Sequence, residues 1–355
     1  MQRNNYLLIV FILCFTKVKA QDIHLSQFYA APLALNPALT GLFPDNDVRL
    51  IVNARNQWQP VLGSDAYNTA NFSTDFRLPI GYKDQMGFGL NLTGDEAGSS
   101  NFKQTIGKIS FSYLKSLGGN RYKTHYLAFG SGLGFNQRSV SSNELRRLSQ
   151  IDDRGIYNSS IQSNEMGDLN SNFKFFDLNI GLMWYTNMPK YYNFYAGFAI
   201  DHLNRPNVSF LKSNPTRIHS KWTLHGGGEI FLADKRWALL PNAIAMKQGA
   251  SFELNLGTAL RHTFSIKGFD EYKAIQAGAW LRLSQKVSMT EKRSVLADAI
   301  ILYTRFDYAD WSIGFSYDAN ISSLRRANAM NGTFELSIAR TFGKGWNTVV
   351  SCPRF

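Results

Sequence analysis

The segment DWSIGFSYDAN (residues 310–320) alternates between large apolar side chains and small or polar ones. Its apolar positions are Trp311, Ile313, Phe315 and Tyr317, and the positions between them are Ser312, Gly314, Ser316 and Asp318. A period of two residues is typical of a β-strand, in which successive side chains point to opposite faces of the sheet. The segment therefore predicts a strand with one ring-rich apolar face and one polar face.

The same alternation recurs in MGFGLNLT (residues 86–93), FFDLNIGLMW (175–184) and SFELNLGTALR (251–261). The polar faces carry mainly Gly, Ser, Asn and Thr with occasional carboxylates, whereas a soluble β-sandwich usually exposes Lys and Glu. A ring-rich face toward lipid and a polar face toward a lumen are typical of an outer-membrane β-barrel. After the N-terminus, no apolar run approaches the roughly 20 residues that a membrane-spanning helix needs. Closure into a barrel is then the way to satisfy every backbone group inside a bilayer.

The pattern predicts an all-β fold, a transmembrane outer-membrane β-barrel of about 14 antiparallel strands, an even number as in bacterial barrels. The strands are expected near residues 48–57, 67–76, 85–93, 102–115, 122–137, 174–187, 191–201, 219–233, 236–247, 250–263, 273–284, 295–306, 310–319 and 331–342. Short connections such as NMPK and DYAD are expected on the periplasmic side. Long ones, including residues 138–173 and 202–218, are expected on the outer side.

The N-terminus predicts export. Residues 1–20 contain Arg3, the apolar run LLIVFILCF and then KVKA, which is typical of a signal peptide cleaved between Ala20 and Gln21. We expect three parts: a signal peptide (1–20), an N-terminal plug or strap segment (21–47) and the outer-membrane β-barrel (48–355). The mature chain would keep one cysteine, Cys352, and therefore no intrachain disulfide.

The segment QDIHLSQFYAAPLALNPALTG (residues 21–41) shows neither a helical nor a strand period. It is nevertheless rich in aromatic, amide and proline residues, a composition that disordered leaders rarely have. We expect it to fold into the barrel lumen or across its periplasmic mouth, as a plug or docking strap. The residues expected to carry this role are Gln27, Phe28, Tyr29, Pro32, Asn36 and Pro37.

Composition and motifs argue against several functions. The formal charge of +12 falls to +9 when Arg3, Lys17 and Lys19 leave with the signal peptide, and basic residues come at most in pairs. A nucleic-acid partner is therefore not expected. No nucleophile elbow, zinc-binding motif or dinucleotide loop is present, so we expect no enzyme activity, no metal site and no cofactor.

Several motifs in one order resemble the PorP/SprF family of type IX secretion system membrane proteins. They are HLSQFYAAPLALNPALTG, ARNQWQPV (54–61), GDEAG (94–98), FDLNIGLMWY (176–185), DHLNRP (201–206), SYDANISSLR (316–325), GTFELSIAR (332–340) and the final CPRF. The similarity covers nearly the whole mature chain. It implies an outer-membrane barrel of a Bacteroidota-type cell that supports type IX export, in some members for gliding motility, and helps secrete or retain a large surface adhesin. It implies no catalytic residues.

The predicted strand register places several of these motifs at the outer end of the barrel. We expect this end to bind a protein partner, because aromatic and rigid loop residues make good anchors. An equally weighted alternative is that these residues pack the loops over the barrel. The candidates are Asn56, Gln57, Trp58, Asp95, Gly98, His202, Leu203, Asn204, Pro206 and Asn320.

Three function classes remain open from the sequence. The favoured one is a non-enzymatic outer-membrane partner in type IX secretion that contacts membrane lipid, a secreted cargo protein or adhesin, and other secretion components. The second is a passive porin or small-molecule channel, which requires an open lumen. The third is a soluble secreted β-protein. Fold alone does not separate the first two, since barrels serve many functions.

Overall fold

The computed structural model describes residues 22–343 apart from residues 45, 82, 99, 121–122, 142–149, 152–157, 159–160, 162–167, 189–191, 233–235, 266–271, 288–292 and 323–331. The predicted signal peptide (1–20), Cys352 and most of the predicted long outer loop therefore lie outside the described residues.

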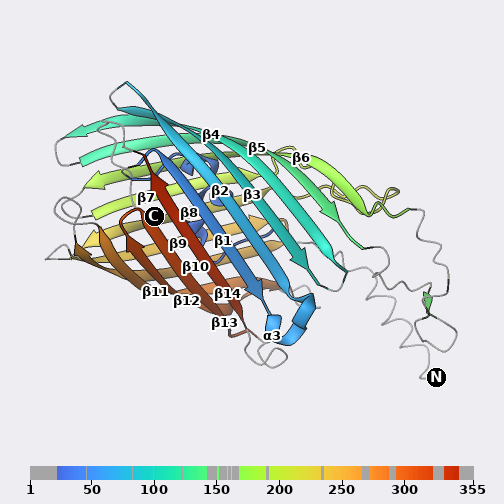
Figure 1. Ribbon diagram of the computed structural model, residues 1–355. Helices are drawn as coiled ribbons and strands as arrows, with labels where there is room; N and C mark the ends of the chain where they lie inside the picture. Colours follow the sequence, from blue (N-terminus) through green and yellow to red (C-terminus); the bar gives the residue numbers. More distant parts are fainter. Residues whose placement is uncertain are drawn as a thin grey trace.

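Within this described part, fourteen antiparallel strands form one closed barrel, in which each strand pairs with its sequence neighbours and β14 pairs with β1 (Figure 1). The strands are β1 (Val48–Gln57), β2 (Tyr67–Ile80), β3 (Asp84–Ala97), β4 (Phe102–Asn120), β5 (Lys123–Ser139), β6 (Asn172–Met188), β7 (Tyr192–Asp201), β8 (Lys221–Phe231), β9 (Trp237–Gln248), β10 (Ser251–Ser265), β11 (Lys273–Val287), β12 (Arg293–Tyr308), β13 (Trp311–Asn320) and β14 (Thr333–Phe342).

The predicted barrel and its strands are confirmed. Strand β1 has the predicted bounds, and most other strands begin or end within three residues of their predicted limits. The main differences are at strand ends: β2 and β3 each run four residues further, to Ile80 and Ala97, and β4 runs five further, to Asn120. These extensions contain Pro79, Gly94, Gly118 and Gly119, which weaken a strand signal in sequence but are tolerated near strand ends and bulges.

The alternation of faces is also as predicted. In β13, Trp311, Phe315 and Tyr317 are exposed on the outside of the barrel, whereas Ser316 and Asp318 are buried toward the lumen. Most outward positions of the other strands are likewise large and apolar. The lumen side is lined by buried charges: Arg49, Arg55, Asp75, Arg77, Asp177, Glu229, Glu253, Arg261, Arg282, Asp307, Asp318 and Glu335. This wall is the polar lumen of a membrane barrel. Among the described helices, none is long and apolar enough to cross a membrane.

The two ends of the barrel differ. We call the end at which β1, β3, β5, β7 and β13 finish the long-loop end, because the extended connections 140–171, 202–220 and 321–332 lie there. The opposite end, with turns such as Ala309–Asp310, is the short-turn end. Short helix α3 (Gln59–Leu62) follows β1 at the long-loop end and lies outside the strand wall (Figure 1). Two loops of this end pair with each other through Leu169 and Leu211.

Candidate functional site

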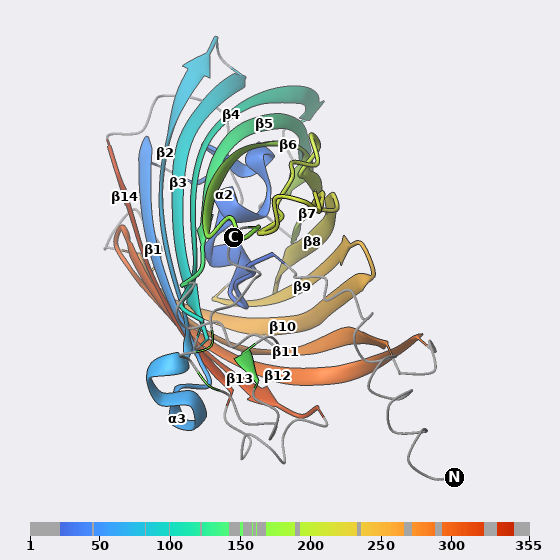
Figure 2. The ribbon, with the colours of Figure 1, turned by 90° about the vertical axis from the view of Figure 1, so that its right-hand side faces the viewer.

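The N-terminal segment runs through the barrel lumen from one end to the other. At the long-loop end, the backbone N–H of Asp22 donates to Gln248 Oε1, the last residue of β9, over 3.0 Å. At the short-turn end, the N–H of Asp47 donates to the carbonyl of Phe342 over 3.1 Å. Figure 2 shows this segment, in dark blue, inside the ring of strands. The segment is therefore luminal along its length, which is the first of the two positions expected from its sequence.

Three short helical turns shape the segment: η1 (Phe28–Ala30), α2 (Pro32–Leu35) and η2 (Pro37–Leu39). Pro32 and Pro37 start the second and third turns, where a missing N–H costs nothing and the fixed φ favours the turn. The side chain of Asn36 caps the third turn by accepting the N–H of Ala38 over 2.9 Å. Turns this short do not persist alone in water, so the lumen wall must stabilise them.

Residues 32–44, which we call the plug, fill the lumen by close packing. Ala38, Leu39 and Leu42 form a buried apolar cluster with wall residues Leu114, Tyr126, Ala128, Met183 and Tyr185. The backbone of the plug approaches the wall at Gly130, where an added Cβ would lie 2.3 Å from the nitrogen of Ala38. At Gly181 an added Cβ would lie 1.8 Å from Asn36 Oδ1. Glycine is required at both positions because the plug occupies the space of a side chain.

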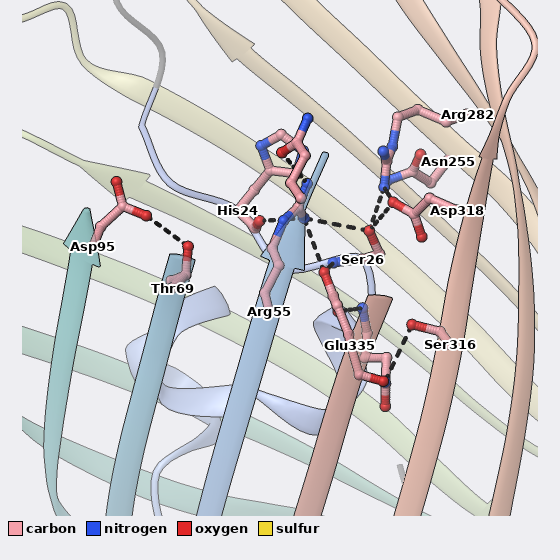
Figure 3. A network of polar contacts seen from close by, with 12 residues as sticks. His24, Ser26, Arg55, Thr69, Asp95, Asn255, Arg282, Ser316, Asp318 and Glu335 are labelled. Atoms are coloured by element: carbon pink, nitrogen blue, oxygen red, sulfur yellow. Dashed lines mark hydrogen bonds and ion pairs between the residues drawn. The ribbon is translucent and has the colours of Figure 1, made fainter. Parts of the chain in front are cut away.

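Residues 22–31, which we call the strap, are held by a network of buried charges (Figure 3). Glu335 accepts the backbone N–H groups of Ser26 and Gln27, one on each carboxylate oxygen, at 2.8 and 2.9 Å. Arg55 lies 2.8 Å from the same carboxylate and donates to the carbonyl of His24 over 2.8 Å. Arg282 donates to Ser26 Oγ and pairs with Asp318 at 2.8 Å.

The wall recognises mainly the backbone of the plug and strap. Asn53 and Arg77 donate to the carbonyls of Ala30 and Phe43 at 3.1 and 2.9 Å, and Asp75 accepts the N–H of Gly41 at 2.7 Å. Further carbonyls of the plug are bound by Arg49, Gln85 and Ser112. Buried backbone groups need partners. A segment without regular secondary structure is buried here because the strands supply those partners.

The first residue of the strap, Asp22, has its carboxylate in a cluster of donors. His202 Nε2 lies 2.5 Å from Asp22 Oδ2, and Gln248 Nε2 donates to the same oxygen over 3.1 Å. The other nitrogen of His202 lies 2.8 Å from Asp177 Oδ1. Lys221 Nζ and Arg138 Nη2 each lie 3.9 Å from a carboxylate oxygen of Asp22.

These contacts determine the protonation states of Asp22 and His202 at the long-loop end of the strap. Burial raises the pKa of Asp22, but the hydrogen bond and charge of His202, together with Lys221, outweigh it and lower that pKa to about 2. Burial lowers the pKa of His202, but its hydrogen bonds to Asp177 and Asp22 outweigh burial and raise that pKa to about 9. His202 is therefore an imidazolium that donates to two carboxylates at neutral pH.

His24, in contrast, is neutral. The nearby carboxylate of Glu253, 3.3 Å from His24 Nε2, raises the pKa of His24. Burial and the positive charges of Arg55 and Arg282 outweigh this effect and lower the pKa to about 4. The neutral ring lies beside the Glu253 carboxylate without adding charge to a region that already holds two arginines.

Small cavities remain beside the segment. A cavity of about 90 Å³ lies between the strap and the wall at the long-loop end, with Asp22, Phe28, Asn71, Lys108 and His202 among its lining residues. A second cavity, of about 100 Å³, lies nearer the short-turn end beside Phe43, Arg49 and Asp307. Plug residues such as Ala38 and Asn36, which are fully buried, lie between the two ends.

The structure places all six residues expected in the plug or strap inside the lumen. Gln27 donates to Ser316 Oγ and to the Glu335 carbonyl. Tyr29 stacks on Trp280 and meets Tyr303 edge-on, with ring centroids 5.7 and 4.9 Å apart. Asn36 lies 3.0 Å from His225 Nε2. Phe28, Pro32 and Pro37 are buried.

The ten residues expected at a partner surface all lie at the long-loop end, but they do not form one exposed patch. His202 and Asn320 are buried, and Asp95 accepts a hydrogen bond from Thr69 on the lumen side. Asn204 holds the loop after β7 to the backbone of β6 through Leu178 and Phe176. The others are exposed or half-buried near the rim: Asn56, Gln57, Trp58, Gly98, Leu203 and Pro206.

Sequence reasoning missed the wall residues that bind the segment. Arg49, Asn53, Arg55 and Arg77 occupy the lumen face of β1 and β2, and of these only Arg55 lies in one of the motifs quoted above, ARNQWQPV (54–61). The available signal was the presence of charged residues opposite large apolar ones, as at Asp318 and Glu335. That pattern shows which residues face the lumen but not which of them meet the segment. Among the described residues, no cluster of three or more His, Cys, Asp or Glu is arranged to hold a metal ion.

Comparison with known proteins identifies the family. Solved structures with similarity include CdiB from Escherichia coli (TM-score 0.47, 12% identity, covering 84% of this chain and 64% of that one) and CdiB from Acinetobacter baumannii (0.42, 8%, 83% and 60%). They also include BamA from Haemophilus ducreyi lacking POTRA domains 1–3 (0.41, 10%, 84% and 70%). This chain thus spans less than two thirds of either CdiB chain. No curated protein matches it. The model of the type IX secretion system membrane protein PorP/SprF matches residues 17–339. The chain therefore belongs to the PorP/SprF family of type IX secretion system membrane proteins.

Proposed function

We propose that this outer-membrane barrel is a membrane anchor that holds a large secreted surface protein, such as an adhesin, at its long-loop end. The observation that carries the proposal is the filled lumen: residues 22–47 run through it and are bound by its wall. A barrel with a filled lumen can bind a partner through its loops but does not provide an open pore. The exposed and half-buried residues of the long-loop end supply the binding surface, with half-buried Trp58 and exposed Leu203 as its aromatic and aliphatic anchors.

The alternative, a passive porin, finds less support. Porins conduct through a water-filled lumen. Here the lumen holds the plug, whose Ala38 and Leu42 have no exposed surface. The lumen cavities beside the segment, of about 90, 30 and 100 Å³, each hold only a few water molecules.

One experiment tests the partner and the orientation together. Cysteine is introduced at exposed Leu203 in the long-loop end, or at exposed Leu232 beyond the β8 end, in a Cys352→Ser background. Intact cells are treated with a membrane-impermeant, thiol-reactive photo-crosslinker, illuminated, and the barrel is purified from detergent-solubilised outer membrane. We expect Leu203→Cys to react and to recover one large surface protein, while Leu232→Cys stays unlabelled. Labelling of Leu232→Cys alone would invert the orientation. Labelling of Leu203→Cys without any captured surface protein would exclude the anchoring function.

A further inference from the structure

We propose that the cluster around Asp22 is a receptor for a carboxylate of the partner polypeptide, and that Asp22 occupies it when the partner is absent. This inference rests on the proposed function, because it names the chemistry by which the long-loop end engages its partner. The strap then acts as an internal competitor for the partner.

The hydrogen-bond donors and cations around the Asp22 carboxylate all belong to the barrel and its loops. His202 follows β7, Lys221 begins β8, Gln248 ends β9, and Arg138 lies in β5. Their atoms converge on the two oxygens of Asp22 at 2.5, 3.9, 3.1 and 3.9 Å, respectively. Because none of these donors lies on the strap, the receptor remains complete when the strap leaves.

The donors are held in place by further contacts. Asp177 fixes the His202 ring through its second nitrogen, and Ser220 donates to the His202 carbonyl over 3.1 Å. Asp201 lies between Lys221 and Lys108, with nitrogen–oxygen distances of 3.3 and 3.1 Å. A preorganised set of donors binds a ligand without first losing conformational freedom.

The charges favour an anion at this position. His202, Lys221, Lys108 and Arg138 contribute four positive charges, whereas Asp177 and Asp201 contribute two negative ones. Asp22 offsets one of the two remaining positive charges. Without Asp22, His202 keeps only Asp177 as a carboxylate partner, and Lys221 and Arg138 lose a nearby negative charge. A carboxylate of a partner that displaces the strap would restore these contacts.

Residues 22–25 of the strap can leave the lumen more readily than the plug. It has no regular secondary structure, and its ties are the contacts of Asp22 together with those of His24 to Arg55 and Glu253. The cavity of about 90 Å³ beside Asp22 and His202 adds to the space that residues 22–25 vacate, and an incoming chain end would occupy both. The plug, in contrast, is wedged against Gly130 and Gly181.

If Asp22 is an internal competitor, removing it and removing a receptor cation should change the binding of an added carboxylate in opposite directions. A tethered group competes at an effective concentration of roughly millimolar. Removing the Asp22 carboxylate should therefore strengthen binding of an added carboxylate, whereas removing a receptor cation should weaken it. If the cluster only held the strap in place, acetate would still fill the space left by Asp22→Ala, but the carboxylate peptide would bind this variant no better than it binds the wild type.

The test uses the full chain purified in detergent, with Asp22→Asn, Asp22→Ala, and Asp22→Ala combined with Lys221→Met. The first probe is acetate, compared with chloride at equal ionic strength in thermal unfolding. The second is a fluorescent Gly/Ser peptide with a free C-terminal carboxylate, compared with its amidated twin and with an amidated peptide carrying one internal Asp. Heat-modified mobility on gels confirms that each barrel is folded.

We expect acetate to raise the unfolding temperature of both Asp22 variants and to leave the wild type and the double variant unchanged relative to chloride. The carboxylate peptide should bind Asp22→Ala at least about tenfold more tightly than wild type, because the tethered competitor is gone. Whether the C-terminal or the internal Asp peptide binds tells which carboxylate the receptor takes. Equal peptide binding to wild type and Asp22→Ala would overturn the receptor, whatever the effect of acetate. Surface-protein capture at Leu203→Cys, measured separately, would in that case leave the anchoring function standing.

Discussion

Deletion of residues 22–39 is expected to convert a closed barrel into a conducting one. The deletion removes the strap and much of the plug, including Ala38 and Leu39 of the buried cluster, while all fourteen described strands keep their partners. The vacated lumen is lined by charged side chains and would fill with water, as in porins. The deletion variant and wild type are compared in planar bilayers, and the deletion alone should give discrete current steps.

Asp22→Ala is the matched control for this deletion, because it releases only the long-loop end of the strap and leaves the plug in place. It should remain as silent as the wild type. Current steps of equal size in wild type and deletion variant would show that the segment does not close the lumen, and the porin function would then be favoured. A barrel that no longer folds would show heat-insensitive gel mobility, which separates loss of assembly from lack of conductance.

Breaking the Arg55–Glu335 pair is expected to cost the most stability of any single substitution in the lumen. The pair is buried, with both side chains less than a tenth exposed and 2.8 Å between Nη1 and Oε1. Glu335→Gln keeps the shape but leaves Arg55 with an uncompensated charge, which costs about 3–5 kcal/mol of unfolding free energy. Equilibrium unfolding by urea, followed by tryptophan fluorescence in detergent, measures this loss.

Two comparison variants show whether the lost stability comes from the unpaired buried charge. Adding Arg55→Met to Glu335→Gln removes the unpaired charge and should recover at least about 1 kcal/mol. The exposed pair of Lys103 and Glu96, 3.1 Å apart, provides the surface control, and Lys103→Met should cost less than about 1 kcal/mol. If Glu335→Gln and Lys103→Met were equally mild, the buried pair would not be what holds the strap.

The barrel was predictable because each strand of a membrane barrel shows its own alternation of lipid-facing and lumen-facing residues. In β13 the rings of Trp311, Phe315 and Tyr317 face outward in strict alternation, so one strand shows both faces without knowledge of its neighbours. Strand ends were less predictable. At β4 the residues Gly118 and Gly119 continue the pairing through a register shift between Ser116 and Gly118, and no alternation marks such an irregularity.

The site was predictable only in part, since its contacts join residues far apart in sequence. The aromatic and proline content of residues 21–41 indicated a folded segment, and the positions of Tyr29 and Asn36 agree with that expectation. The partners of the segment did not follow from the sequence: Glu335 binds Ser26 across a separation of 309 residues. His202 illustrates the same limit, because its motif suggested a surface loop whereas its side chain turns inward to Asp22.

The N-terminal segment lies inside the closed barrel, and a disulfide cross-link tests this position most directly. Thr40 Oγ1 of the plug lies 2.8 Å from Ser110 Oγ on the lumen face of β4, close enough for a disulfide to replace the two hydroxyls. The adjacent residue Ile109 faces outward and is exposed. In a Cys352→Ser background, Thr40→Cys with Ser110→Cys should cross-link under mild oxidation and shift in non-reducing gels, whereas Thr40→Cys with Ile109→Cys should not. Failure of the first pair to cross-link, or equal cross-linking of both, would contradict the luminal position of the segment.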